Sequence, residues 1–152
     1  MYFDSTIPEG YGVGSSGALV AAVYERYAIN KISILENLDI KKLLKLKIIF
    51  SKMESFFHGN SSGLDPLNSY LSLPILVNSK TEIKATGIPS QTHDGSNAVF
   101  LLDSGTKSET SSLVSIFLNK LKIPAFKKMI EDEFIKSSDL CIEYFLGSNN
   151  EM

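Results

Sequence analysis

The feature that most constrains this chain is a run of alternating glycines at positions 10, 12 and 14. Ser15, Ser16 and Gly17 follow directly, and an apolar stretch over 18–23 comes next. Glycine lets backbone N–H groups approach a ligand closely, and a helix that begins behind such a loop directs its positive end to the same place. The segment therefore predicts a phosphate-binding loop at the start of a helix.

Two known phosphate-loop patterns can be compared with this segment. A Walker loop needs Gly-Lys-Ser/Thr after its glycines, and no lysine follows Gly14. Gly12-Val-Gly14-Ser-Ser-Gly17 does match the dinucleotide fingerprint, and Glu36 stands near the ribose-binding distance of about 20 residues. Pro8 and Glu9, however, separate the glycines from the preceding predicted strand. A dinucleotide-binding oxidoreductase stays open as one alternative.

A second group of polar residues extends from Glu54 to Asp65. Glu54 falls on a largely apolar predicted helix, where a carboxylate must lie at the edge, be paired, or bind a cation. Mg²⁺ is commonly held by one or two protein oxygens plus phosphates and water, and Glu54 with Ser16 would suit that pattern. Asp65 can accept the proton of a substrate hydroxyl, or it can form a helix-capping box with Ser62.

Charge, cysteine content and hydropathy exclude several classes of partner. The formal net charge of −2 predicts no attraction to nucleic acid or to an anionic membrane. The single cysteine, Cys141, fits a reducing cytosol. No apolar stretch approaches the ~20 residues of a membrane span, and the N-terminus does not read as a signal peptide. We therefore predict a cytoplasmic protein without nucleic-acid or membrane partners.

Helix and strand patterns mix along the chain without a regular βαβ alternation, which predicts an α+β fold. Helices are expected over about 15–29, over 40–57 with Asp39 as N-cap, from Ser62 onward, and over about 110–121 and 124–146. Strands are expected over 1–7, 74–77, 82–86 and 98–102. Residues 87–97 are polar and turn-rich, so we expect a first domain over 1–92 and a second over 93–152.

Three blocks of the sequence resemble one known superfamily. Pro8-x-Gly10-x-Gly12-Val-Gly14-Ser15-Ser16-Gly17-Ala18 resembles the signature of the GHMP kinases, which include galactokinase, homoserine kinase, mevalonate kinase and phosphomevalonate kinase. Glu54-Ser-Phe-Phe-His58-Gly-Asn-Ser-Ser-Gly-Leu-Asp65 resembles, without a gap, the second block of mevalonate kinase and its close relatives. Residues 100–110 resemble the segment that begins the family's C-terminal domain.

The resemblance implies an ATP-dependent kinase that phosphorylates an alcohol such as mevalonate, with ATP and Mg²⁺ as cofactors. It implies a two-layer fold, with most of a ribosomal-protein-like α/β sandwich followed by the start of a ferredoxin-like domain. The implied site residues are Gly10, Gly12, Gly14, Ser15, Ser16 and Gly17 for the nucleotide, Ser16 and Glu54 for the metal, Asp65 for catalysis, and His58 and Ser104 for the substrate.

Family members also carry an N-terminal motif before the glycine loop and a C-terminal glycine-rich segment, and this sequence shows neither. We therefore expect an internal fragment of such a kinase that is weak or inactive by itself, because phosphoryl transfer depends on positioning by a complete site. A non-catalytic remnant or binding module with the same fold is the alternative. The expected partner is a small-molecule alcohol, and a homodimer is a possible assembly.

Overall fold

The fold is described from a computed structural model of the chain, which describes residues 4–34, 38–86, 102–103, 105–106 and 110–147. The contact pattern divides the chain into two compact units, residues 1–87 and 88–152. The α+β class expected from the sequence is confirmed, because helices occur together with a small antiparallel sheet. The finer domain boundary at residue 92 stays a prediction.

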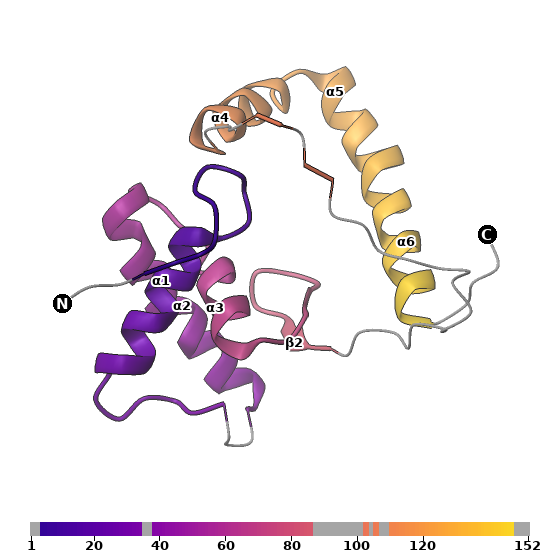
Figure 1. The fold of residues 1–152 in the computed structure, drawn as a ribbon. Coiled ribbons are helices and arrows are strands. Elements are labelled where there is room, and N and C mark those ends of the chain that lie inside the picture. Colours follow the sequence, from indigo (N-terminus) through magenta and orange to yellow (C-terminus); the bar gives the residue numbers. More distant parts are fainter. Residues whose placement is uncertain (1–3, 35–37, 87–101, 104, 107–109, 148–152) are drawn as a thin grey trace. The chain divides into compact units, whose positions relative to one another are not determined.

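Three helices and one hairpin make up the described part of the first unit (Figure 1). The helices are α1 (Ser15–Tyr27), α2 (Ile40–His58) and α3 (Leu64–Leu71), and the strands are β1 (Ile75–Val77) and β2 (Ile83–Ala85). The strands pair antiparallel, with Ile75 opposite Ala85. The Asp39 side chain accepts a hydrogen bond from the backbone N–H of Lys42 at 2.8 Å, so the predicted N-cap of α2 is confirmed.

The strand expected over residues 1–7 is wrong for its described part. Residues 4–7 are not in a strand, and no described strand pairs with them. Extended apolar residues become a strand only where a neighbouring strand satisfies their N–H and C=O groups. The local pattern could not reveal that this partner is missing among the described residues.

The core of the first unit is an aromatic cluster to which each helix contributes one ring. Tyr24 of α1, Phe50 of α2 and Tyr70 of α3 meet edge to face, with ring centroids 5.0 to 5.5 Å apart. Such pairs contribute about 0.5–1.5 kcal/mol beyond the area they bury. Around the rings lie fully buried side chains from the same helices and from β2, namely Val20, Leu46, Leu67 and Ile83.

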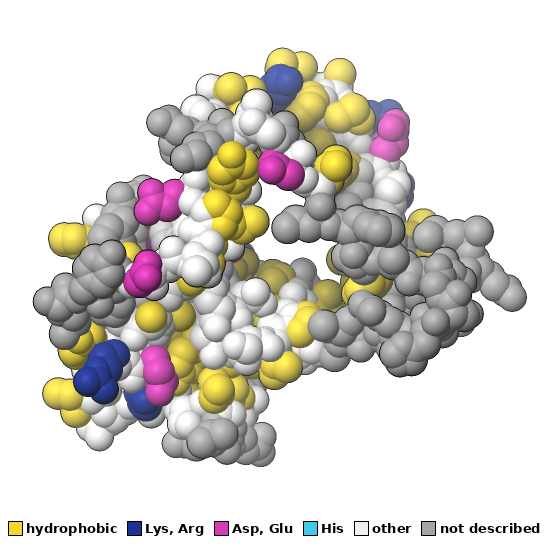
Figure 2. Space-filling view, in the orientation of Figure 1, with side chains coloured by type: hydrophobic (Ala, Val, Ile, Leu, Met, Phe, Trp, Pro, Cys, Tyr) yellow, Lys and Arg dark blue, Asp and Glu magenta, His cyan; other side chains and the backbone are white. Residues whose placement is uncertain are grey.

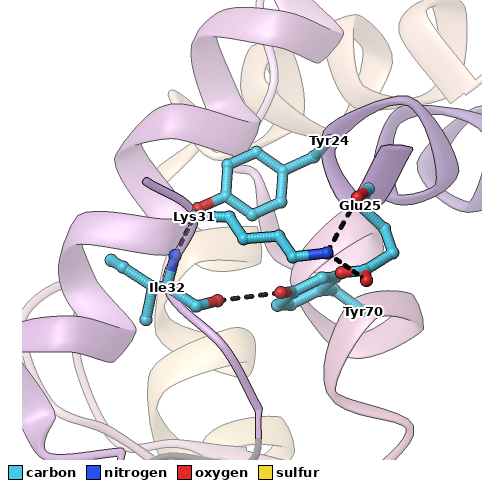
Figure 3. A network of polar contacts seen from close by, with 5 residues as sticks. All are labelled: Tyr24, Glu25, Lys31, Ile32 and Tyr70. Carbon is cyan, nitrogen blue, oxygen red and sulfur yellow. Dashed lines mark hydrogen bonds and ion pairs between the residues drawn. The ribbon is translucent and has the colours of Figure 1, made fainter. Parts of the chain in front are cut away.

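Polar contacts at the edge of this cluster fasten the segment that follows α1 (Figure 3). The backbone N–H of Ile32 donates to the Tyr24 hydroxyl at 3.0 Å, and the Tyr70 hydroxyl donates to the Ile32 carbonyl at 2.8 Å. Lys31 forms a hydrogen-bonded ion pair with Glu25, and it also donates to the Glu25 carbonyl at 3.0 Å. The hydrogen bond from Lys31, together with its charge, lowers the pKa of Glu25 below its ordinary value.

α3 approaches α2 at a glycine that has both an unusual backbone conformation and no room for a side chain. Gly63 N-caps α3 with φ +73°, and a methyl group there would lie 2.3 Å from the Lys47 carbonyl oxygen and 2.6 Å from the Ser51 nitrogen. Left-handed backbone disfavours any residue with a Cβ. Gly63 therefore sets how closely the two helices pack.

All regular elements in the described part of the second unit are helices. They are α4 (Thr110–Lys120), α5 (Pro124–Met129), the π-helical turn η1 (Ile130–Phe134) and α6 (Ile135–Gly147). The predicted helix over 124–146 is confirmed, with Pro124 at its start and a π-helical turn within it. Phe117 and Phe126 pack edge to face at 6.0 Å. The strand expected over 98–102 lies, apart from Leu102, outside the described residues.

Most apolar side chains of these helices are exposed. Figure 2 shows hydrophobic side chains gathered over α4 and α5, and no residue of α5, η1 or α6 is buried. None of the helices in the described part of the chain is both long enough and apolar enough to cross a membrane.

The Lys31–Glu25 pair predicts a specific change in titration. Lys31→Met should raise the pKa of Glu25 toward its ordinary value, because the hydrogen bond and the positive charge are both removed. A lowered carboxyl pKa means that the pair supports the fold above pH 4.5 and that this support is lost as the pH falls below it. NMR titration of the Glu25 carboxyl measures the change. Lys52→Met, on the exposed face of α2, is the control, and an unchanged Glu25 pKa in Lys31→Met would contradict the assignment.

Gly63 predicts a large loss of stability on substitution. Gly63→Ala should reduce the free energy of unfolding by at least about 3 kcal/mol, because left-handed strain adds to a collision with the α2 backbone. Gly59→Ala is the matched control, since Gly59 also has a positive φ but has nothing within 4 Å of the added methyl group. Its expected cost is about 1 kcal/mol. Urea unfolding followed by circular dichroism compares the two, and equal losses would refute the packing argument.

Candidate functional site

The glycine loop enters α1 through three glycines in the left-handed conformation. Gly10, Gly12 and Gly14 have φ angles of 80°, 70° and 74°, which only glycine adopts without strain. Gly14 is the N-cap of α1, and its carbonyl accepts the Ala18 N–H at 2.9 Å. No side chain of the described residues caps this helix, so the N–H groups of its first turn are open to an anionic ligand.

Ser16 connects this loop to a buried carboxylate on α2. The Ser16 hydroxyl donates to Oε1 of Glu54 at 3.0 Å, although the two residues lie 38 positions apart in the sequence. Glu54 is only 5% exposed, and the Ser61 hydroxyl donates to its second oxygen, Oε2. Burying a carboxylate is costly unless its oxygens have partners. Two serines from different segments supply those partners here.

The loop that carries Ser61 is fastened to α2 by further serine hydrogen bonds. The Ser51 hydroxyl donates to the Ser61 carbonyl at 2.7 Å, and the Ser61 N–H donates to the Ser55 hydroxyl at 3.1 Å. The Ser61 hydroxyl also accepts the Gly63 N–H at 3.0 Å. No motif in the sequence singles out Ser61. The signal that could have found it is the placement of Ser51, Glu54 and Ser55 on one stretch of α2, where polar residues interrupt an apolar helix.

Asp65 lies in the first turn of α3, directly against the glycine loop. A methyl group at Gly17 would lie 2.8 Å from the Cβ and backbone carbon of Asp65, and one at Gly14 would lie 3.8 Å from the same Cβ. The side chain of Asp65 is exposed, and it has no hydrogen-bond or ion-pair partner in the described part of the chain. A carboxylate therefore stands free beside the open first turn of α1.

The capping box proposed for Ser62 and Asp65 is wrong. Gly63 is the N-cap of α3, no side chain bonds to its cap, and the Ser62 hydroxyl accepts the Leu64 N–H at 3.2 Å. The left-handed Gly63 changes the chain direction one residue later than the capping pattern assumed. Among the described residues, Asp65 has no structural partner that would explain its presence.

Three other residues named from the sequence cannot be placed in this site. His58 ends α2, but its side chain is not among those described. Ser104 lies outside the described residues, and so does Glu36, the carboxylate required by the dinucleotide interpretation. Their assignments stay predictions.

The donor atoms at Ser16 and Glu54 fit a small, hard cation. Both residues offer oxygen, the ligand atom that Mg²⁺ prefers, and the carboxylate brings a negative charge into a nearly buried position. Within the described ranges, no group of three or more histidine, cysteine or acidic side chains could form a protein-only metal site. The two oxygen donors of Ser16 and Glu54 suit a cation that takes its remaining ligands from phosphate and water.

A groove of about 470 Å³ lies elsewhere on the first unit. It runs along one face of α1, against the segment after that helix and against α3, and none of the predicted site residues lines it. Its lining residues are Ala18, Ala21, Ala22, Glu25, Ser33, Ile34, Ser69 and Tyr70. The candidate site is therefore an open loop with its adjoining carboxylates, distinct from this groove.

The close contact between Gly17 and Asp65 predicts a local effect of substitution. Gly17→Ala should lower the free energy of unfolding by about 2 kcal/mol, because overpacking at this contact outweighs the helix propensity gained. It should also shift the NMR resonances of Asp65 and its neighbours. Gly12→Ala is the control, since its methyl group meets nothing within 4 Å and its effect should stay within the loop. Unchanged Asp65 resonances in Gly17→Ala would contradict the contact.

Comparison with protein families produced a match, whereas a search of curated proteins and a search of solved structures found none. Residues 1–72 match the family model described as the GHMP kinases N terminal domain. The match covers just under half of the 152 residues and includes the glycine loop, α1, α2 and α3, with Glu54 and Asp65. The family match thus supports the GHMP kinase superfamily for the segment that contains the candidate site.

Proposed function

We propose that this chain is part of an ATP-dependent small-molecule kinase of the GHMP type, with an alcohol as phosphoryl acceptor. The family match of residues 1–72 supports a kinase in general terms. The acceptor, the cofactors and the roles of individual residues are inferred from the geometry of the glycine loop and its neighbouring carboxylates.

The observation that carries the proposal is the hydrogen bond between Ser16 and Glu54. It joins a phosphate-binding type of loop to a nearly buried carboxylate from a distant part of the sequence. A loop whose glycines served only to cap a helix would need no such carboxylate. A nucleotide triphosphate with Mg²⁺ needs both, because the phosphates require N–H donors and the cation requires oxygen ligands.

We infer the roles of the residues from their positions. The open N–H groups and the positive end of α1 would bind the ATP phosphates at the loop of Gly10, Gly12 and Gly14, with Ser15 and Gly17 in the first turn. Ser16 and Glu54 would hold Mg²⁺. When bound, the cation would neutralise negative charge on the phosphates.

Asp65 is the residue we assign to the acceptor. Its Cβ and backbone lie against Gly17, with the Cβ also next to Gly14, so this exposed residue is close to the place proposed for the phosphates. There it would orient the acceptor hydroxyl toward the terminal phosphate and accept its proton. We propose mevalonate as the acceptor because residues 54–65 resemble the mevalonate kinase branch. His58 and Ser104 are the further substrate contacts of this proposal.

Calorimetric titration with ATP, in magnesium and in EDTA, tests the nucleotide site. Wild type should bind ATP more tightly in magnesium, and Glu54→Ala should lose at least about tenfold of that gain, because a charged ligand of the cation is removed. Asp65→Asn should keep the gain, since the residue is assigned to the acceptor. Glu82→Gln, in the β-hairpin, is the matched carboxylate control and should behave as wild type.

A phosphotransfer assay with mevalonate and Mg-ATP tests the chemistry. Any transfer measured with wild type should fall by about 10²–10⁴-fold in Asp65→Asn, the usual contribution of a positioned base. Absence of magnesium-dependent ATP binding in wild type would refute the kinase proposal in favour of a non-catalytic binding module. Binding of NAD in place of ATP would favour the dinucleotide alternative.

A further inference from the structure

We propose that Ser61 is a positioning residue that holds the Glu54 carboxylate in the orientation in which its Oε1 faces Ser16 and the glycine loop. The inference rests on the proposed kinase function, since it concerns the residue that would bind the cation there. Neither the glycine loop nor the spacing between Glu54 and Asp65 indicates a role for Ser61.

The two oxygens of Glu54 have donors from different segments. Ser16, on α1, donates to Oε1, whereas Ser61, in the loop before α3, donates to Oε2. The terminal torsion of a glutamate is broad, so one hydrogen bond leaves the carboxylate plane free to turn. Donors at both oxygens fix the plane, and Glu54 is too buried for water to replace either of them freely.

The direction of the Ser61 hydroxyl is itself determined by its surroundings. Its oxygen accepts the Gly63 N–H at 3.0 Å, and Gly63 is held against the backbone of α2. A hydroxyl has one proton and two lone pairs, so the proton of Ser61 is left for the Glu54 carboxylate. Ser61 acts as a donor to Oε2 in this arrangement.

The backbone of Ser61 is anchored on both sides. Its N–H donates to the Ser55 hydroxyl and its carbonyl accepts from the Ser51 hydroxyl, at 3.1 and 2.7 Å. Both partners belong to α2, the helix that carries Glu54. Ser61 is therefore hydrogen-bonded to the rigid helix that carries the carboxylate. A precise positioning contact requires such support.

The two serines would act differently when a cation is bound. Ser16 and Oε1 of Glu54 would both face a bound Mg²⁺, so Ser16 would then act through its oxygen lone pairs. Ser61 bonds the opposite oxygen and lies outside the proposed ligand set. It would keep the carboxylate in place with and without the cation.

The test compares Ser61→Ala with Ser51→Ala. Each variant removes one hydroxyl that binds the same loop to α2, but only Ser61→Ala removes a donor to Glu54. ATP affinity is measured by calorimetry in magnesium and in EDTA, with thermal unfolding of each ligand-free variant. We expect Ser61→Ala to lose about tenfold of the magnesium-dependent gain in affinity, the range found for residues that orient metal ligands, with affinity in EDTA unchanged. Ser61→Thr should keep the gain, and Ser51→Ala should lose less of it than Ser61→Ala, because the Ser61 backbone keeps its second anchor at Ser55 and Glu54 keeps its donor.

The outcomes separate this inference from the proposed function. If Glu54→Ala loses the magnesium-dependent gain and Ser61→Ala keeps it, Ser61 has no positioning role. Equal losses in Ser61→Ala and Ser51→Ala would also overturn the inference, because the effect would then come from the loop as a whole. A wild-type chain without any gain refutes the kinase function and this inference with it. Should Ser61→Ala not fold, Ser61→Cys keeps the side-chain size with a weaker donor and should show a smaller loss.

Discussion

The arrangement of the first unit depends on close backbone approach at two glycines. Gly17 lets the start of α3 lie directly against α1, and Gly63 lets the same end of α3 lie against α2. Because any Cβ at these positions would collide with backbone, the spacing cannot be recovered by side-chain rearrangement. The approach brings together three segments that are distant in the sequence, and Glu54 of α2 bonds Ser16 of α1 and Ser61 before α3.

The fold accommodates the carboxylate of Glu54 in a nearly buried position. An unpaired charge at this depth would cost several kcal/mol, of the order given for buried ions in proteins. The chain surrounds it with hydroxyl donors, which are neutral and small, and does not pair it with a lysine or an arginine in the described part of the structure. A neutral environment of this kind satisfies the carboxylate without cancelling its charge, so its attraction for a cation is retained.

Sequence patterns predicted local structure well where one residue decides it. Asp39 and Pro124 mark the starts of α2 and α5, and apolar periodicity gave the helices and the hairpin strands to within one or two residues. The patterns failed where contacts between segments distant in the sequence determine the structure. The strand expected at 1–7 lacked a partner in its described part, the capping box overlooked the left-handed Gly63, and nothing local linked Ser61 to Glu54. The chemistry of metal binding predicted that Ser16 and Glu54 act together. Only the fold shows that the two side chains are hydrogen-bonded, at 3.0 Å.

The π-helical turn η1 has a consequence for how the second unit can change during evolution. A π-turn closes its hydrogen bond one residue later than an α-turn, and one residue corresponds to about 100° of rotation around the axis. The extra residue is accommodated within η1, and the helix continues from α5 into α6 without a break. In evolutionary terms η1 behaves as a one-residue insertion that the helix has absorbed. Removing one residue from 130–134 should therefore restore a regular α-helix over this region.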